Sequence, residues 1–245
     1  MCTVTFVPVD GGFCISSNRD ENSQRSPAVP PHGYLSGDVR LSFPKDPQAG
    51  GSWIAVKDHA NAAVLLNGKI KTPSLTGYKK SRGLILLDIL AANDPLYSFA
   101  NLNLGGIAPF VLILLAHSSL FECSWDGTRK SFQNLPVQNR YIWSSRSLYN
   151  DLVIRKRERW FRDWASVNKN PGLPDIVHFH QNAGDGNRAY SLVMNRGDGL
   201  QTVSITNVLL TPALTRMKYL DIKGGQTYEH VLTDRELHQH EFSAV

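Results

Sequence analysis

The amino-acid sequence predicts an α+β fold in which sheets form a sandwich and helices pack on the outside. Three observations support this class. Strand segments separated by Gly-containing turns occur near both ends of the chain and in its middle, and helical segments lie between them. The 245 residues are 42% apolar and 19% charged, as is usual for a globular protein. No repeat, low-complexity tract or long linker interrupts the chain, so we expect one domain over residues 1–245.

The strands are predicted from alternating or continuous apolar segments. Residues 2–9 alternate, and the turn Asp10-Gly11-Gly12 leads into a second strand over residues 13–17. A second hairpin is predicted from residues 53–56 and 62–66. Further strands are expected over residues 110–115, 120–125, 202–208, 216–222 and 227–232, with turns at Asp126-Gly127 and Gly224-Gly225.

Three helices are expected between these strands. The first covers residues 81–93 and ends at Asp94-Pro95, the clearest covers residues 148–167, and a short third helix covers residues 175–182. The predicted apolar side of the second helix consists of Leu148, Leu152, Trp160, Phe161 and Trp164. Its basic residues are expected to lie mostly elsewhere, and they are Arg155, Lys156, Arg157, Arg159 and Arg162.

Composition limits the cellular setting. The net charge of +5 permits anionic partners but specifies none. The three cysteines, Cys2, Cys14 and Cys123, form no CxxC pair, which argues against a disulfide framework or zinc knuckle and favours a reducing compartment. The first residues do not resemble a secretory signal, and the longest apolar run, residues 107–116, is too short to cross a bilayer. We therefore expect a cytoplasmic protein without a membrane span.

Binding of metals, dinucleotides or nucleic acid is not expected. His178 and His180 are two residues apart in a predicted helix and so point in different directions. Residues 184–187 lack the third glycine and the preceding strand of a dinucleotide-binding fingerprint. The basic segment 155–162 suits nucleic acid superficially, but aromatic residues at helical spacing within the same helix favour packing on a sheet.

The turn of the first hairpin decides which residue lies opposite Cys2, whose alternation places it on the side of Val4 and Phe6. A two-residue turn at Asp10-Gly11 pairs Cys2 with Arg19, and a three-residue turn over residues 10–12 pairs it with Asp20. Both interpretations fit the sequence. In either case the opposed Cβ atoms lie within about 5 Å, so a charged side chain can reach the sulfur or the adjacent backbone nitrogen.

Removal of Met1 would leave Cys2 with a free α-amine beside its own thiol. An amine with a pKa of about 8 can act as a general base, and a nearby guanidinium favours the thiolate. Nucleophile and base would then belong to one residue. The alternative interpretation is that Cys2 is a buried apolar residue of an edge strand, as free cysteines commonly are.

Four motifs occur in order along the first 90 residues. They are the opening Met1-Cys2, the tetrad Asn18-Arg19-Asp20-Glu21 at the end of the second strand, the segment Gly50-Gly51-Ser52-Trp53, and the strand end Leu66-Asn67. In combination they resemble the NRDE family, also called the transport and Golgi organisation protein 2 family. The tetrad, its distance from Cys2 and the following GG-[ST]-W are specific together, and the resemblance continues thinly through the rest of the chain.

The resemblance implies the N-terminal nucleophile (Ntn) hydrolase fold, a four-layer αββα sandwich of two mainly antiparallel sheets. In the related conjugated bile acid hydrolases and penicillin V acylases, an N-terminal cysteine attacks an amide carbonyl. Carried over by position, Cys2 would be the nucleophile, and Arg19 and Asp20 would hold its amine and thiolate. Asn67 would donate a hydrogen bond to the oxyanion. Those amidases have a carboxylate three residues after the arginine, whereas Asp20 follows Arg19 directly, so Glu21 is an alternative for that role.

Asn18, Glu21 and Trp53 are candidates for substrate contacts at the same site. Structural roles are open alternatives for these motifs. The tetrad would then be a charged turn after a strand, with Asp20 as a cap and Arg19 in a surface ion pair. Trp53 would be core packing, and Asn67 would belong to a turn.

Two hypotheses of function follow. The leading one is an Ntn cysteine hydrolase that cleaves a nonpeptide C–N amide bond of a small or hydrophobic molecule through Cys2 and requires no cofactor or metal. The alternative is a noncatalytic protein that binds or carries haem or another hydrophobic ligand, with Cys2 as an axial thiolate; haem handling has been proposed for some NRDE proteins. Both predict a small-molecule or hydrophobic partner, and neither predicts an oligomeric state.

Overall fold

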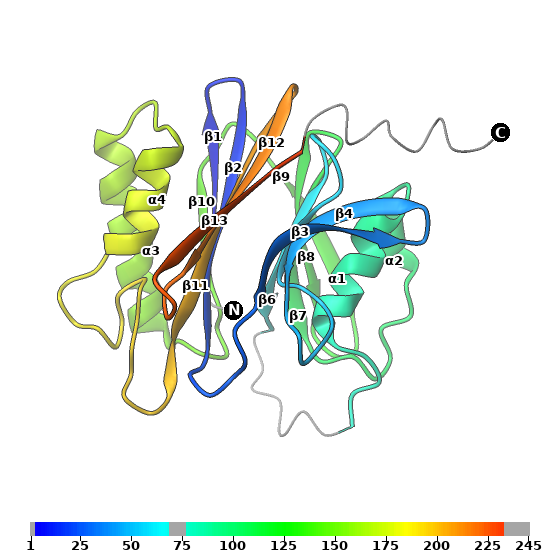
Figure 1. Cartoon of the computed structure of the whole chain (residues 1–245), viewed down its shortest axis with the longest axis horizontal. Helices are drawn as coiled ribbons and strands as arrows, with labels where there is room; N and C mark the ends of the chain where they lie inside the picture. Colours follow the sequence, from blue (N-terminus) through cyan, green and yellow to red (C-terminus); the bar gives the residue numbers. More distant parts are fainter. Residues whose placement is uncertain (1–2, 69–76, 233–245) are drawn as a thin grey trace.

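Two antiparallel sheets face each other, and helices cover the outer face of each, as the computed structural model shows (Figure 1). The structure describes residues 3–68 and 77–232. The smaller sheet has the order β10 (Tyr141–Ser144), β1 (Thr3–Val9), β2 (Gly12–Asn22), β11 (Leu200–Thr211), β12 (Leu214–Asp221), β13 (Gln226–Leu232). The larger sheet has the order β3 (Val29–Ser36), β4 (Val39–Lys45), β5 (Ile54–Val56), β6 (Ala62–Asn67), β7 (Phe110–Ala116), β8 (Ser119–Trp125), β9 (Lys130–Leu135).

The helices form the two outer layers. The smaller sheet is covered by α3 (Asp151–Val167) and α4 (Leu173–Asn182), and the larger sheet by α1 (Arg82–Ala91) and α2 (Pro95–Asn101) (Figure 1). The layer order is therefore αββα, which confirms the predicted α+β sandwich of mainly antiparallel sheets. No helix in the described ranges is long and apolar enough to cross a membrane.

Strand periodicity divides the apolar side chains between three interior regions. Val4, Phe6 and Ile15 lie between the two sheets, because alternate residues of β1 and β2 face the larger sheet. Cys14 and Phe161 belong to the layer between the smaller sheet and its helices. A third cluster fills the space between the larger sheet and α1. Burial of these side chains from water is the main force that holds the layers together.

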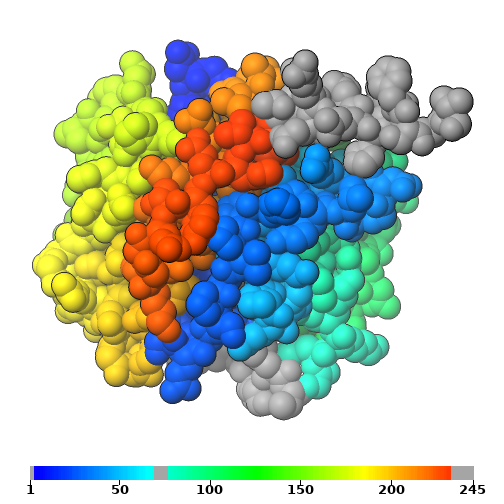
Figure 2. Space-filling view, in the orientation of Figure 1, coloured from blue at the N-terminus to red at the C-terminus, as the bar shows by residue number. Residues whose placement is uncertain are grey.

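The edges of the two sheets meet where β13 lies against β3, and Figure 2 shows this contact on the surface as red beside blue. The His32 and His230 rings, one from each strand, are 6.2 Å apart. The hydroxyl of Ser42 lies 3.0 Å from His230 Nε2. Segments at opposite ends of the described chain thus close one edge of the sandwich.

The predicted strands and turns are confirmed, but several elements were missed. The hairpin β3–β4 was not predicted, because β3 contains two prolines and a glycine, which are depleted in strands. The short strands β9 and β10 were not predicted either. The second strand is longer than expected and runs to Asn22, so the tetrad lies within β2 and is not a turn after it.

Four expectations about helices need correction. Asp94-Pro95 was expected to end a helix, but the Asp94 carboxylate accepts a hydrogen bond from Tyr97 N and caps α2. In α3, Leu152 was expected on the apolar side, yet it is 59% exposed. Arg157 was expected away from the interior, yet it is completely buried. The fourth correction is minor, since α4 begins at Leu173 rather than Asp175.

Candidate functional site

The register of the first hairpin selects between the two turns considered above. Thr3 pairs with Asn18 and Val9 with Gly12, so the turn has two residues, Asp10 and Gly11, and the three-residue alternative is wrong. Gly11 has φ +70°, which a two-residue hairpin turn requires and which glycine adopts without strain. Cys2 and Met1 lie outside the described residues, so the pairing predicted for Cys2 stays a prediction.

The tetrad divides between the two faces of β2. Arg19 points into the space between the sheets, where its guanidinium carbon lies 4.3 Å from the centroid of the Trp53 ring. Asn18 and Asp20 point to the helical layer, as period-two alternation requires. The Asn18 amide donates to the carbonyl oxygens of His180 and Leu192 at 3.1 and 2.9 Å. The structure therefore does not bring Asn18 to the same side as Arg19.

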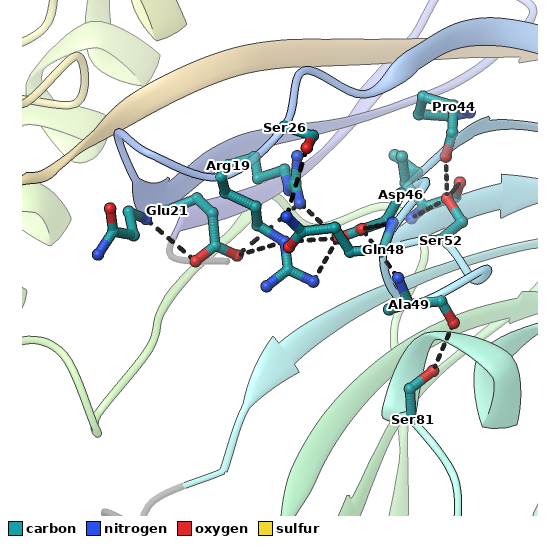
Figure 3. A network of polar contacts seen from close by, with 12 residues as sticks. Arg19, Glu21, Ser26, Pro44, Asp46, Gln48, Ala49, Ser52 and Ser81 are labelled. Carbon is teal, nitrogen blue, oxygen red and sulfur yellow. Dashed lines mark hydrogen bonds and ion pairs between the residues drawn. The ribbon is translucent and has the colours of Figure 1, made fainter. Parts of the chain in front are cut away.

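Arg19 is held by a buried ion-pair network, shown in Figure 3. Its Nη2 lies 2.7 Å from Asp46 Oδ2 and 3.8 Å from Glu21 Oε2. Arg25 contacts the same two carboxylates, at 2.8 Å from Asp46 and 3.7 Å from Glu21. Burial lowers the pKa of Arg19, and the adjacent Asp46 and Glu21 oppose this shift. A guanidinium remains charged in proteins, so Arg19 provides a fixed cation between the sheets.

Sequence reasoning missed Asp46, the main partner of Arg19. Its Oδ1 accepts hydrogen bonds from the backbone N–H groups of Gln48 and Ala49 at 3.0 and 3.1 Å, while Oδ2 faces the two arginines (Figure 3). One oxygen thus shapes a turn and the other neutralises Arg19. The available signal was the turn-forming run that contains Asp46-Pro47, which is typical of an aspartate that caps its own loop.

The Gly-Gly-Ser-Trp segment supports this network from the larger sheet. Gly50 has φ +71°, and a Cβ on Gly51 would lie 2.5 Å from the backbone carbon of Gly83 at the start of α1. Ser52 Oγ donates to the Pro44 carbonyl oxygen at 2.7 Å and so joins the segment to β4. Trp53 is buried between the sheets, and its ring lies against the Arg19 guanidinium.

Asp20 is bound from two further elements. Thr202 of β11 donates to Oδ1 at 2.5 Å, and the Tyr149 hydroxyl donates to Oδ2. A register shift between Thr202 and Ser204 interrupts the β2–β11 pairing here. The shift aligns Thr202 with Asp20, whereas Ser204 is aligned with Arg19. Sequence reasoning did not identify Tyr149.

Asn67 ends β6 on the opposite sheet. A cleft of about 410 Å³ is lined by both Asn67 and Arg19, together with Asp20, Glu21 and Trp53. Five of the six described candidates therefore meet at one cleft. Ser145 Oγ donates to the Asn67 backbone carbonyl at 3.3 Å. In the described part of the chain no hydrogen bond engages the Asn67 side-chain amide.

A second cavity, of about 280 Å³, shares a wall with this cleft. Arg19, Glu21 and Arg25 line both spaces. The remaining wall of the smaller cavity includes apolar side chains such as Pro27 and Val203. Arg19 and Glu21 of the tetrad therefore separate the larger cleft from the smaller cavity, and the two spaces have different linings.

The two described cysteines are poor nucleophiles. Cys14 and Cys123 are buried, and burial raises the pKa of each thiol to about 12. Such thiols remain protonated at neutral pH. Within residues 3–68 and 77–232, no group of three His, Cys, Asp or Glu side chains is arranged to hold a metal ion.

Comparison with solved structures defines the class of fold. Two variants of the conjugated bile acid hydrolase from Clostridium perfringens each align with TM-score 0.63 and 10% identity, over 96% of this chain and 93% of theirs. The N-acylethanolamine-hydrolyzing acid amidase orthologue of Caenorhabditis elegans aligns with TM-score 0.59 and 12% identity, over 85% and 92%. At these identities the likeness concerns the fold, which is that of the Ntn hydrolases.

The sequence defines the family within that class. The model of the Transport and Golgi organisation 2 family matches residues 1–172. The chain therefore belongs to this family, the one that its motifs resemble. No curated protein sequence matches the chain.

Proposed function

We propose that the protein is an Ntn amidohydrolase that cleaves a nonpeptide C–N amide bond of a small or hydrophobic molecule. The observation that carries the proposal is the buried Arg19 beside the open end of a hairpin with a two-residue turn. If the same pairing continues by one residue, Arg19 lies opposite Cys2. The family and the fold support the same activity, since the amidases that share this fold are hydrolases by their names.

The proposed reaction begins after removal of Met1. The α-amine of Cys2 takes the thiol proton, and the thiolate forms a bond to the amide carbonyl carbon. Arg19 favours the thiolate by its charge. The side-chain amide of Asn67 stabilises the oxyanion of the tetrahedral intermediate. The C–N bond then breaks, the amine proton passes to the leaving nitrogen, and water hydrolyses the thioester to restore the thiol.

The cleft favours a substrate with both polar and apolar parts. Charged side chains of the tetrad lie beside Trp53 in the 410 Å³ cleft, and the adjoining 280 Å³ cavity adds apolar surface. An acyl chain that extends from the reacting carbonyl would fit such an adjoining space. A substrate panel should therefore contain conjugated bile acids, N-acylethanolamines and shorter N-acyl amines.

The first test concerns the state of the N-terminus. The untagged protein is analysed by intact mass before and after treatment with a thiol-reactive acylating probe, with Cys2→Ala as the loss variant and Cys14→Ala as a matched control. Loss of Met1 and a single adduct that is absent only from Cys2→Ala would support the proposal. Retained Met1, or labelling that does not depend on Cys2, would contradict it.

If this test contradicts the hydrolase, the remaining hypothesis is a protein that binds or carries a hydrophobic ligand. A carrier tolerates retained Met1 and needs no turnover of any amide in the panel. Addition of haemin to the wild-type protein would then give a spectral shift that is lost in Cys2→Ala. The same protein samples serve both measurements.

We also propose a reducing, cytoplasmic location, which a free reactive Cys2 would require.

A further inference from the structure

Arg157 of α3 is a cation in the layer behind the smaller sheet, and its side chain has no exposure to solvent. Its Nη1 donates to Thr3 Oγ1 at 2.6 Å. Its Nε and Nη2 donate to the carbonyl oxygens of Tyr190 and Ser191 at 3.1 and 2.8 Å. Among the residues that the structure describes, no carboxylate forms an ion pair with it. The hydrogen-bond partners of Arg157 are therefore all neutral groups.

Such a cation is difficult to explain as packing. Removing a charge from water is unfavourable, and apolar residues of similar volume often stabilise a protein better than buried ions. Arg157 recovers part of this loss from three directional hydrogen bonds and from the face of the Tyr149 ring, which lies 3.9 Å from its guanidinium carbon. The choice of arginine is understandable if these particular contacts matter.

Two contacts of Arg157, with Thr3 and with the Tyr149 ring, lead to the open end of the β1–β2 hairpin. Thr3 is the first described residue of β1, and it follows Cys2 in the sequence. The guanidinium lies on the ring of Tyr149, and the Tyr149 hydroxyl donates a hydrogen bond to the carboxylate of Asp20 in β2. A second cation, Arg196, lies 5.0 Å from the same ring. Arg157 therefore binds one strand directly and reaches the other through Tyr149.

We propose that Arg157 is a positioning residue that fixes the open end of this hairpin and supplies a constant positive charge to it. A nearby cation disfavours an ammonium and favours a thiolate. Both effects would increase the reactive, deprotonated forms of the Cys2 amine and thiol. The inference rests on the proposed function, because it takes Cys2 as the reacting residue.

Other charged groups surround the same end of the hairpin, and the test must keep them constant. They are Arg19, Asp20, Glu21, Arg25, Asp46, Lys80 and Arg82, which line the cleft. None of them is changed in the variants used here. A shift in the behaviour of Cys2 can then be assigned to the Arg157 contacts.

The test measures the rate at which iodoacetamide alkylates Cys2 from pH 5 to pH 10, with the adduct located on the N-terminal peptide. Thr3→Val removes the hydroxyl that Arg157 binds, and Thr3→Ser retains it. Thr5→Val is the matched control, because Thr5 is a buried threonine of the same strand whose hydroxyl contacts His180 at 2.7 Å instead. We expect Thr3→Val to slow alkylation of Cys2 at pH 7 about tenfold and to raise the midpoint pH of the rate profile. The rates of Thr3→Ser and Thr5→Val should stay within about threefold of the wild-type rate.

Arg157 itself is tested with Arg157→Lys and Arg157→Gln. The lysine variant keeps the charge, so the midpoint pH of Cys2 alkylation should change little. The glutamine variant removes the charge and should raise this midpoint pH. If Arg157→Gln does not fold, Thr3→Val carries the test beside Thr3→Ser and Thr5→Val, because it removes only the hydroxyl that Arg157 Nη1 binds. Equal effects of Thr3→Val and Thr5→Val would overturn the proposal.

Three further outcomes separate this inference from the proposed function. A wild-type Cys2 that titrates as an ordinary thiol overturns the positioning role, whether or not amides are cleaved. A midpoint that shifts as expected in a protein that cleaves no amide supports the positioning role and contradicts the hydrolase. Turnover that is unaffected by Thr3→Val supports the hydrolase and contradicts the positioning role.

Discussion

Asp46→Asn tests the ion pair that fixes Arg19. The substitution keeps the shape of the side chain and the oxygen that accepts from Gln48 N and Ala49 N, so the turn is retained. It removes the negative charge that lies 2.7 Å from Arg19 and 2.8 Å from Arg25. Arg19 is 3% exposed, so solvent cannot replace the lost partner.

The expected loss follows from this geometry. Removing one member of a buried ion pair destabilises a protein by about 3–5 kcal/mol, because the other charge is left uncompensated. Glu21 remains 3.8 Å from Arg19 and opposes part of the effect. We therefore expect a decrease of about 3 kcal/mol in the free energy of unfolding, which corresponds to about 6–12 °C in Tm for a chain of this size.

Urea unfolding at pH 7, followed by tryptophan fluorescence and circular dichroism, measures the loss. Asp88→Asn is the control, because it breaks a pair with Lys80 in which both side chains are 39% exposed. Exposed pairs contribute about 0–1 kcal/mol, so this variant should change little. If Asp46→Asn loses no more stability than Asp88→Asn, the account of Arg19 as a buried, paired cation is wrong.

Three other predictions concern the support of the site, its pH dependence and its chemistry. Gly51→Ala should lower the free energy of unfolding by about 1–3 kcal/mol in the same assay, since the new Cβ would lie 2.5 Å from the Gly83 backbone, whereas Gly172→Ala meets only ordinary contacts at 3.5 Å. Burial lowers the pKa of His180 from 6.5 to about 3, so the unfolded chain takes up this proton first. The free energy of unfolding therefore has its full value above pH 6.5 and decreases toward pH 3, with a loss of about 2 kcal/mol between pH 6.5 and 5. In His180→Gln the free energy of unfolding should depend less on pH over this range. Asn67→Ala should reduce kcat for an amide substrate about 10²–10³-fold with little change in KM, and an unchanged kcat would remove Asn67 from the oxyanion site.

Local patterns predicted the parts of the structure that depend on neighbouring residues. The turn at Asp10-Gly11 and the alternation of β1 and β2 are set within 20 residues, so the sequence limited the hairpin to two registers, and Gly11 at φ +70° fits the observed one. The meeting of Arg19 and Asn67 at one cleft was predicted from family motifs rather than from local patterns. Their roles remain proposals.

Long-range contacts explain what sequence reasoning missed. Arg157 was expected away from the apolar side because it is charged, although its helical spacing from Trp160 and Phe161 places it on that side. Its partners are the hydroxyl of Thr3 and carbonyl oxygens 33 and 34 residues later in the chain. Asp46 follows β4, a strand that was not predicted, so nothing in the sequence indicated that Asp46 contacts Arg19. At Asp94 the same residue types that end one helix begin another, and only the hydrogen bond to Tyr97 N distinguishes the two.

The most direct test of the central claim is capture of an acyl-enzyme. The processed protein is mixed with an amide substrate identified from the panel, quenched in acid within the first turnover, digested and analysed by mass spectrometry. The proposed mechanism predicts a thioester on the N-terminal peptide at Cys2, absent from Cys2→Ala and present in Cys14→Ala. Turnover of the amide by Cys2→Ala at the wild-type rate, without any acylated N-terminal peptide, would contradict the claim.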